Sequence, residues 1–470
     1  MKPDIVSYII MVFFAFWVGF SPSAKGQIIL DGEFSDWTDI EAVKESDSFV
    51  RKFKLTDNQK YLYGYLQVSD SVSIQSFNGK LSLIFSAGSD TLNLIFSRQD
   101  NLQTRTYVHT GFGTGIGHHT FDEDTLDPPT ELSLAVLPSH QSRQFEFRIK
   151  KKRDDIFTDH TGMDVQLLYT LNDSTTHLES DKYTFNNHEF KKFSQSIEKD
   201  EDEARLLTWN VMGDKLKNYS VFKKVIDAAN PDIVLLEEVY EGIEPGDLHK
   251  HLFPPGWHIS VSENGYRKTV IASREPHKFL KLLSDIEYPS KNISDLINEQ
   301  PVGLQWVRED RSNGISSSGA LIEATGQEIL FVLVGLTCCG HDGSWEDTMR
   351  ILEASLLSER IQHILEEREV PVIISGDLNL VGSVQPLDIL RNSKSPPLKS
   401  LDMLQHTDRA AYTWRGLINS PFGPGRLDYV LVDQSLVTEG FIIKLEDLLT
   451  DEELMKSSDH YPLVTDIKKH

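Results

Sequence analysis

The chain has 470 residues, 39% hydrophobic and 25% charged, a composition typical of soluble folded proteins and a length sufficient for two or three domains. The chain has 47 basic and 71 acidic residues, which gives a formal net charge of −24. This charge excludes the bulk positive charge typical of nucleic-acid-binding proteins. The two cysteines, Cys338 and Cys339, are adjacent, which excludes a disulfide scaffold and a four-thiolate zinc site.

The N-terminal segment has the order of parts of a secretory signal peptide. Lys2 precedes the apolar run VSYIIMVFFAFWVGF (6–20), and the small residues of SPSAKGQ follow it. This run is short for a membrane span, which needs about 20 apolar residues. We therefore expect a signal peptide over residues 1–26 and export of the mature protein to a periplasm or out of the cell, with no integral membrane span.

Alternating apolar and polar residues from Ile28 to about Phe190 predict short strands. The clearest runs are KYLYGYLQV (60–68), KLSLIF (80–85), DTLNLIF (90–96) and RQFEFRIK (143–150). Strands at this spacing, separated by turn residues, favour an all-β sandwich over residues 27–190. The glycine run GFGTGIGHH (111–119) lacks the order of a nucleotide-binding loop, so we expect a surface loop there.

The opening of this segment, ILDGEFSDW (29–37), combines an Asp-Gly turn with an acidic-aromatic pair. It resembles the start of the family-nine-like carbohydrate-binding modules of secreted enzymes. The resemblance implies a glycan as a partner of this domain. Because aromatic residues lie mostly in cores, we expect Trp37 itself to be a core residue.

A charged run, KKFSQSIEKDEDEAR (191–205), follows and indicates a solvated linker over residues 191–204. Beyond it the pattern changes, because strand-like runs now alternate with helical spacing. The strand runs are LLTWN (206–210), DIVLLEEV (232–239) and VPVIISGDLN (370–379), and the helical spacings fall at 221–229 and 349–365. This alternation predicts an α/β domain over residues 205–470.

Polar residues stand at the ends of these predicted strands, where packing alone would not place them. They are Asn210, Glu237, Glu238, Asp377, Asn379 and Asp428, joined near the C-terminus by Asp459 and His460. Carboxylate and carboxamide oxygens suit Mg²⁺, with Mn²⁺ or Ca²⁺ as alternatives, rather than zinc. A histidine beside such a metal can supply acid/base chemistry or phosphate contacts, so the set indicates phosphoryl transfer.

The blocks TWN, LLEEV, SGDLN, RLDYVL and SDHYPLV, in this order, resemble the endonuclease/exonuclease/phosphatase superfamily over about residues 204–470. The resemblance implies a four-layer αββα sandwich and a metal-dependent hydrolase acting on phosphoric ester bonds. It also implies that Glu238 is the main metal ligand and that Asp459 and Asn210 complete the metal shell.

The resemblance assigns further roles to individual residues. Asp377 would orient or deprotonate the attacking water, and Asn379 would hydrogen-bond a phosphate oxygen, with Asn210 beside them as a further catalytic group. His460 would bind the scissile phosphate and stabilise charge in the transition state. Asp428 would hold His460 in the required tautomer.

Contacts with substrate are expected from residues near these blocks. The string AYTWRG (411–416) resembles another family step, in which Trp414 would be a wall of the site or part of the core. The cations Arg415 and Arg426 would face a phosphate. His341 is a further candidate, as a substitute general acid.

Two positions depart from the pattern of the resemblance. Glu237 stands where the superfamily usually has glutamine, and the extra carboxylate would either perturb its neighbours or point to solvent. Thr337 stands at about the position of a histidine that many members carry, which removes one candidate general acid. We expect Cys338 and Cys339, which follow it, to be buried small residues.

Three functions fit these observations. The first is an exported, Mg²⁺-dependent phosphodiesterase or endonuclease. The second is the same chemistry on a phospholipid or sugar phosphate, towards which the acidic balance points. The third is a non-catalytic binding protein, supported only by the departure at Thr337.

Overall fold

The computed structural model describes residues 27–74, 80–96, 115–118, 126–127, 133–153, 155–171, 174–265, 267–289, 314–416 and 423–469. The expected signal peptide (1–26) and positions 111–114 and 119 of the glycine run lie outside these ranges. Among the helices within the ranges, none combines the length and apolar character needed to cross a membrane.

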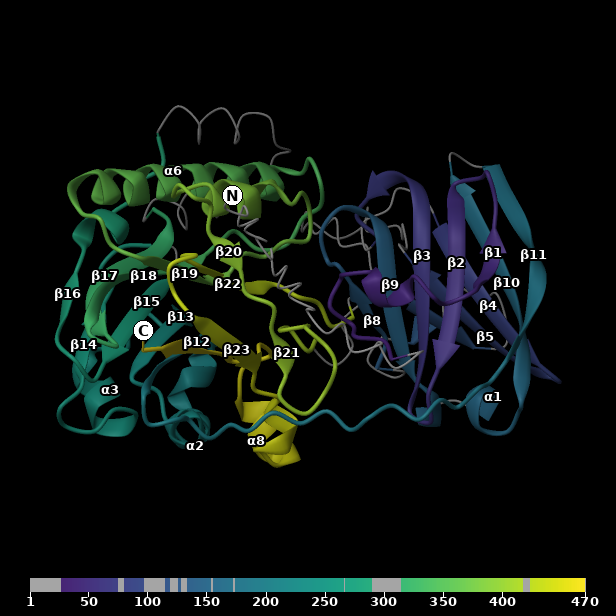
Figure 1. Ribbon diagram of the computed structural model, residues 1–470, viewed down its shortest axis with the longest axis horizontal. Helices are drawn as coiled ribbons and strands as arrows, with labels where there is room; N and C mark the ends of the chain where they lie inside the picture. The colour runs from purple at the N-terminus through teal and green to yellow at the C-terminus, as the bar shows by residue number, and fades with distance from the viewer. Residues whose placement is uncertain are drawn as a thin grey trace, which may run out of the picture.

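The N-terminal part of the described chain is built from two antiparallel sheets (Figure 1). The first has the order β1-β2-β3-β9-β8, with β1 (Ala42–Glu45), β2 (Val50–Asp57), β3 (Tyr61–Val72), β8 (Ala135–Leu137) and β9 (Ser142–Lys150). The second has the order β11-β10-β4-β5-β6-β7, with β4 (Lys80–Ala87), β5 (Asp90–Phe96), β6 (Gly115–His118), β7 (Leu126–Asp127), β10 (Gly162–Leu171) and β11 (Ser174–Thr184). The short helices are η1 (Ser35–Trp37), η4 (Lys151–Arg153) and α1 (Asp155–Thr158).

Side chains from both sheets meet in one hydrophobic core, as the period-2 pattern predicts. The four clearest expected strands are confirmed as β3, β4, β5 and β9. At Gly64 a Cβ atom would fall 2.1 Å from the Phe147 ring, so glycine there lets this aromatic ring pack across the strand. The expectation of a loop throughout the glycine run is wrong for Gly115–His118, which pairs with β5.

Trp37 is a core residue as expected, with 1% of its surface exposed. Its Nε1 donates to Oε2 of the buried Glu146 at 2.9 Å, and Oε1 of Glu146 accepts from the backbone N–H groups of Asp31 and Gly32. Burial is the main cause that raises the pKa values of Asp31 and Asp36 to about 6, and it holds that of Glu146 well above its ordinary range. The Asp-Gly turn is therefore tied to a buried acidic cluster.

We expect Asp36→Asn to increase the free energy of unfolding at pH 7.5 by about 1–2 kcal/mol, a value reduced from the full linkage for partial exposure. A carboxyl whose pKa is raised in the folded state destabilises the fold as the pH rises from about 4 to about 6. The difference from wild type should therefore vanish near pH 4. Denaturant unfolding at the two pH values measures it, and a difference independent of pH would contradict the assignment.

The C-terminal part also contains two sheets, but these mix parallel and antiparallel pairs. One has the order β14-β15-β13-β12-β24-β23-β21, with β12 (Glu203–Gly213), β13 (Ile233–Val239), β14 (His258–Val261), β15 (Lys268–Ser273), β21 (Leu404–Gln405), β23 (Thr438–Ile442) and β24 (Leu463–Lys468). The other has the order β16-β17-β18-β19-β22-β20, with β16 (His277–Phe279), β17 (Ser316–Ala324), β18 (Gln327–Gly335), β19 (Val372–Asp377), β20 (Lys399–Ser400) and β22 (Asp428–Val432).

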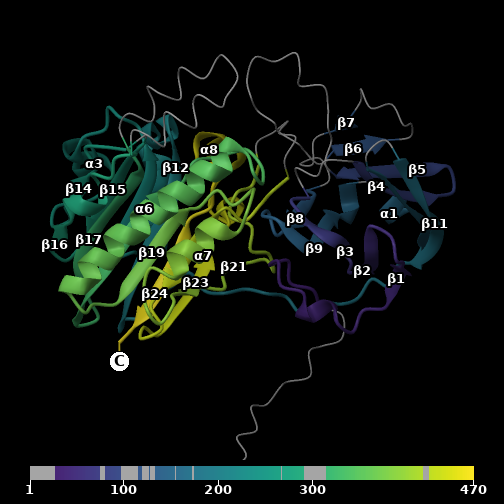
Figure 2. The same ribbon diagram turned by 90° about the horizontal axis from the view of Figure 1, so that it is seen from above.

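The helices of this part are α2 (Tyr219–Ala229), α3 (Pro245–His251), α6 (Trp345–Glu367), α7 (Gln385–Arg391) and α8 (Asp451–Lys456), with short η5 (Asp214–Lys217), η6 (Lys281–Leu283) and η7 (Leu445–Asp447). Alternate residues of β18 enter different cores. Phe331 packs in the cluster that joins the two sheets, whereas Leu330 and Val332 pack in the cluster that contains α6 residues. Figure 2 shows α6 lying along the outer face of the second sheet. The C-terminal part is therefore sheet-rich and layered.

The expected elements of this part are largely confirmed. The runs 206–210, 232–239 and 370–379 correspond to β12, β13 and β19, and the first helical spacing is α2, which ends at Asn230 in a left-handed conformation (φ 47°). Residues 189–200 have no regular secondary structure, an isolated bridge at His188 precedes them, and β12 begins at Glu203. Arg205, next to the expected boundary, is buried and pairs with Asp466 at 2.6 Å.

Candidate active site

The polar strand ends of both C-terminal sheets converge. Asn210 lies near the end of β12 and Glu238 near the end of the parallel neighbour β13, both in the first sheet. Asp377 is the last residue of β19 in the second sheet, and its register partner on β22 is Asp428. Asn210 Nδ2 donates to Glu238 Oε1 and to Asp377 Oδ2, both at 3.1 Å, so the two sheets are joined at this point.

His460 lies between two carboxylates in the same place. Its Nδ1 is 2.8 Å from Asp428 Oδ2, and its Nε2 is 3.8 Å from Asp377 Oδ2. The backbone of His460 is fixed as well, because its N–H donates to Ser458 Oγ and its carbonyl accepts from Trp209 Nε1. Burial opposes the charged imidazole, but the charges of Asp428 and Asp377 outweigh it and hold the pKa of His460 well above its usual value.

Asp377 is buried and its neighbours hold it firmly. Its Oδ1 accepts from the backbone N–H of Asn379, and its own N–H donates to both carboxylate oxygens of Glu237 at 2.9 and 3.1 Å. Burial, reinforced by the negative charge of Asp428, raises the pKa of Asp377 to about 7. Its carboxyl therefore gains and loses a proton near neutral pH, which suits a general base.

Glu237 is a site residue that the sequence reasoning left with two alternatives, and it does not point to solvent. It is 1% exposed, and burial with the charges of Asp377 and Asp428 holds its pKa well above the ordinary range. Strand alternation would send Glu237 and Glu238 to opposite faces. Glu238 instead has a positive φ of 51° at an irregularity in β13, and both side chains contact site residues.

The other residues expected to bind phosphate or metal are held by hydrogen bonds to the protein. Asn379, with φ 48°, donates through Nδ2 to the carbonyl of Leu336 at 3.0 Å. Asp459, adjacent to His460, accepts from Trp414 Nε1 at 2.8 Å, so Trp414 holds an expected metal ligand. Asn210 Oδ1 accepts from the N–H of Met212, which leaves its second lone pair for a cation.

The expected substrate-binding cations are engaged with the protein. Arg415 Nη2 donates to the carbonyl of Leu454, and Arg426 Nη2 donates to that of Leu401 while its guanidinium lies 4.7 Å from the Tyr429 ring centroid. His341 Nδ1 is 2.8 Å from the carbonyl of Asp342. Contacts of these three side chains with substrate therefore stay predictions.

Thr337 has a clear structural role. Its N–H and its hydroxyl both donate to the buried Glu353 of α6, at 2.7 and 2.6 Å. The expectation that the next two residues are buried is wrong, because Cys338 is exposed and Cys339 is half-buried. The loop turns outward here, with Cys339 in a left-handed conformation (φ 71°).

The donors gathered here fit a divalent cation. Buried ligand atoms of Asp377, Asp428 and His460 lie within 4.8 Å of one another. This group differs from the ligands expected from the sequence, of which Asn210 and Glu238 are hydrogen-bonded to each other and Asp459 accepts from Trp414. Glu237 and Glu238 add two more carboxylates to the same contact network, so negative groups outnumber the imidazole among the residues described above. Because carboxylate oxygens outnumber the single imidazole nitrogen donor group, the set favours a hard cation such as Mg²⁺ over zinc.

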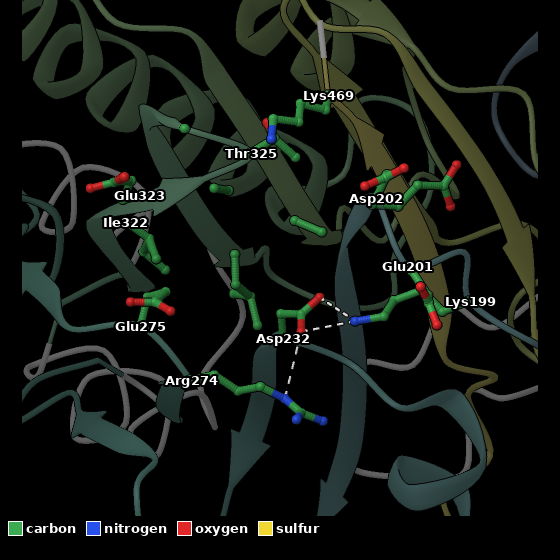
Figure 3. A pocket seen from close by; sticks show the side chains of 15 residues that line it. Lys199, Glu201, Asp202, Asp232, Arg274, Glu275, Ile322, Glu323, Thr325 and Lys469 are labelled. Carbon is green, nitrogen blue, oxygen red and sulfur yellow. Dashed lines mark hydrogen bonds and ion pairs between the residues drawn. The ribbon is translucent and has the colours of Figure 1, made fainter.

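A separate cavity of about 390 Å³ lies at the opposite ends of the same strands (Figure 3). It is lined by the starts of β12 and β13 and by the β17–β18 turn. Asp232 there pairs with Lys199 at 2.7 Å and Arg274 at 3.6 Å, so its charge is already offset within the protein. This cavity is not part of the polar cluster at the strand ends.

The residues of this cluster fall within the range that matches a known family. Residues 207–460 match the Endonuclease/Exonuclease/phosphatase family, and the chain belongs to that family. Its members depend on divalent metal ions.

Individual relatives are distant. The DNA-(apurinic or apyrimidinic site) endonuclease 2 of Schizosaccharomyces pombe is 22% identical over 318 residues, 56% of this chain, and the chain spans only 58% of that relative's length. A structure of truncated TDP2 from Caenorhabditis elegans has 16% identity and a TM-score of 0.38, covering 57% of this chain and 98% of its own. A mannosyl-6-phosphatase from Bacteroides thetaiotaomicron has 16% identity and a TM-score of 0.38, covering 56% and 99%.

Proposed function

We propose that this chain is an exported, Mg²⁺-dependent phosphodiesterase of the nuclease type that hydrolyses its substrate by in-line attack of water. The observation that carries the proposal is the buried His460, which lies 2.8 Å from Asp428 and 3.8 Å from Asp377. A carboxyl able to titrate near neutral pH and a charged imidazole therefore stand side by side. One can take a proton from water while the other binds a phosphate oxygen.

Asp377 orients the attacking water in this proposal and accepts its proton. The backbone N–H of Asn379 and the side chain of Asn210 both donate to Asp377, and these hydrogen bonds fix the direction of its carboxyl group. Fixing a reacting group in this way raises the rate, because less orientational entropy is lost on reaching the transition state.

His460 and Asn379 bind the phosphoryl oxygens. Asp428 accepts from Nδ1 of His460, which directs the Nε2 proton to the substrate and stabilises the charged ring. One N–H of the Asn379 amide is used by Leu336, and its second N–H is left for a phosphate oxygen. A divalent cation, held by Glu238 and Asp459 with Asn210 beside them, would offset negative charge on the phosphoryl oxygens.

The substrate class follows from two observations that point in different directions. The name of the matched yeast relative, an endonuclease at abasic sites in DNA, favours a nucleic-acid diester. The net charge of −24 favours a less charged ester, such as a phospholipid or sugar phosphate, as the second candidate. Mn²⁺ or Ca²⁺ could replace Mg²⁺ with the same oxygen ligands.

We also propose the domain organisation expected from the sequence. It consists of a signal peptide (1–26), a β-sandwich (27–190), a linker (191–204) and a four-layer αββα catalytic domain (205–470). The hydrophobic cluster between the two N-terminal sheets, which contains no residue of the C-terminal part, supports the division. Leu30, Ala135 and Leu137 nevertheless pack in the main cluster of the C-terminal part, so the two parts also share apolar contacts. A glycan at the first domain would have to bind elsewhere than Trp37, which is buried.

Plasmid nicking by the protein without residues 1–26 tests the function. We expect nicking with Mg²⁺, a loss of at least about 100-fold in a chelator and recovery when Mg²⁺ is returned. Vesicles containing sphingomyelin or phosphoinositides, and sugar phosphates, form parallel arms. An intact plasmid with turnover in another arm would replace the nuclease by the second candidate, and no turnover in any arm would refute the proposal.

A further inference from the structure

The N-terminal part is bonded to the segments that carry the proposed catalytic residues. A loop between β8 and β9 (138–141) and Ser73, just after β3, lie against three loops of the C-terminal part. Figure 1 shows β8 and β9 on the side of the N-terminal sheets that faces the other part. This arrangement differs from a binding module that is only tethered by a linker.

The first contact fixes the chain immediately before Asp428. The backbone N–H of Arg426 donates to Ser139 Oγ at 3.0 Å, and the N–H groups of Leu427 and Asp428 both donate to Thr413 Oγ1 at 3.0 Å. Three successive amides are thus held by two hydroxyl groups. Ser139 is 1% exposed and is the member of the pair that comes from the N-terminal part.

The approach of the two parts at this point is close. A Cβ atom at Gly425 would lie 2.6 Å from Ser139 Oγ, so a side chain at position 425 would force the segments apart. Gly425 is itself paired with Trp414, whose N–H donates to the Gly425 carbonyl at 2.9 Å. Trp414 in turn bonds Asp459, so the same segment is connected to an expected metal ligand.

The second and third contacts hold two further loops of the C-terminal part. Ser73 Oγ donates to the carbonyl of Val381 at 3.0 Å, and the N–H of Gln141 donates to that of Gly382 at 2.7 Å. These two carbonyls follow Asn379 closely in sequence. Gln141 Nε2 also donates to Asp342 on the loop that precedes α6, at 3.0 Å.

We propose that Ser139 is a positioning residue for the reaction. By accepting from the Arg426 amide it fixes the start of β22, and therefore the direction in which Asp428 holds His460. The inference rests on the proposed hydrolase function, and it makes the N-terminal part a component of the catalytic unit. Displacing a reacting group by a fraction of an ångström slows the chemical step more than it weakens substrate binding.

The test compares Ser139→Ala with Tyr65→Phe, a control that loses one hydrogen bond, to Gln144, inside the N-terminal part. We expect Ser139→Ala to lower kcat roughly 10- to 100-fold on a nitrophenyl phosphodiester, with KM within about twofold. We expect the control to match wild type. The downfield proton signal of His460 Nδ1–H, identified by its loss in Asp428→Asn, should shift in Ser139→Ala and not in Tyr65→Phe.

The outcomes separate the two proposals. If wild type turns over substrate and Ser139→Ala does so equally well with an unshifted proton signal, the positioning role is refuted. If wild type is inactive on every phosphoester, the proposed function fails and the role of Ser139 in the reaction falls with it, whereas an unshifted proton signal in Ser139→Ala of an active protein refutes the positioning role alone. If Ser139→Ala does not fold, Ser139→Cys, a weaker acceptor, replaces it and should give an intermediate kcat and shift.

Discussion

Replacing Asp377 by asparagine is expected to lower kcat by about 10³-fold or more, because the change removes the proposed general base and keeps the size of the side chain. The backbone N–H of residue 377 would still donate to Glu237, so the main chain should not move. The side chain can still accept from either Asn210 or Asn379, although not from both in one orientation.

The same substitution should cost little stability. Burial and the charge of Asp428 raise the pKa of Asp377 to about 7, which means that its ionised form is unfavourable in the folded protein. Removing that charge offsets the loss of one hydrogen bond, so we expect the free energy of unfolding to stay within about 1 kcal/mol of wild type. An inactive protein of unchanged stability is the signature of a catalytic residue rather than a structural one.

Steady-state kinetics and denaturant unfolding of Asp377→Asn measure both effects. Asp388→Asn is the matched control, because Asp388 undergoes the same chemical change on the exposed side of α7. It should leave kcat and stability as they are. A kcat for Asp377→Asn within tenfold of wild type would remove Asp377 from its proposed role and make another group the base.

Much of the candidate site could be predicted because strand ends are visible in the sequence. Asn210, Glu238, Asp377 and Asp428 each end or begin an apolar run, and neighbouring strands bring such ends together. The contact of His460 with Asp428 agrees with the tautomer role that the family resemblance implies. The type of side chain at a strand end can therefore be predicted from the sequence.

The features that could not be predicted depend on local conformation or on distant partners. The inward direction of Glu237 requires the positive φ of Glu238, which a period-2 pattern does not contain. Thr337 is explained by its hydrogen bond to Glu353 of α6. The absence of the family's histidine at position 337 did not indicate that partner. The contact of Ser139 with Arg426 joins residues 287 positions apart.

The contact between the two parts includes a buried ion pair, and Asp408→Ala is expected to lower the free energy of unfolding by about 3–5 kcal/mol. Arg148 of β9 donates to both carboxylate oxygens of Asp408, at 2.9 and 3.0 Å, and Lys444 lies 3.3 Å away. Arg148 is 3% exposed, and its guanidinium packs 4.3 Å from the Tyr61 ring centroid. Without Asp408 this charge would stay buried and unpaired.

The effect should be insensitive to pH over the neutral range. Burial alone would raise the pKa of Asp408, but Arg148 and Lys444 outweigh it and hold the pKa well below its usual value. A carboxyl with a lowered pKa stabilises the fold at every pH above its unfolded value of about 4, and that contribution is lost only as the pH falls further. The difference between wild type and Asp408→Ala should therefore be constant from pH 5 to pH 8.

Denaturant unfolding of three variants separates the ion pair from the other contacts between the two parts. Asp402→Ala, at an exposed position on a nearby loop, should change the free energy of unfolding by less than about 0.5 kcal/mol. The double variant Arg148→Met/Asp408→Leu removes both charges and should regain most of the stability lost in Asp408→Ala, because the penalty lies in the unpaired guanidinium. A loss below about 1 kcal/mol in Asp408→Ala would mean that water reaches Arg148, and the two parts would then be joined mainly by their backbone and hydroxyl contacts.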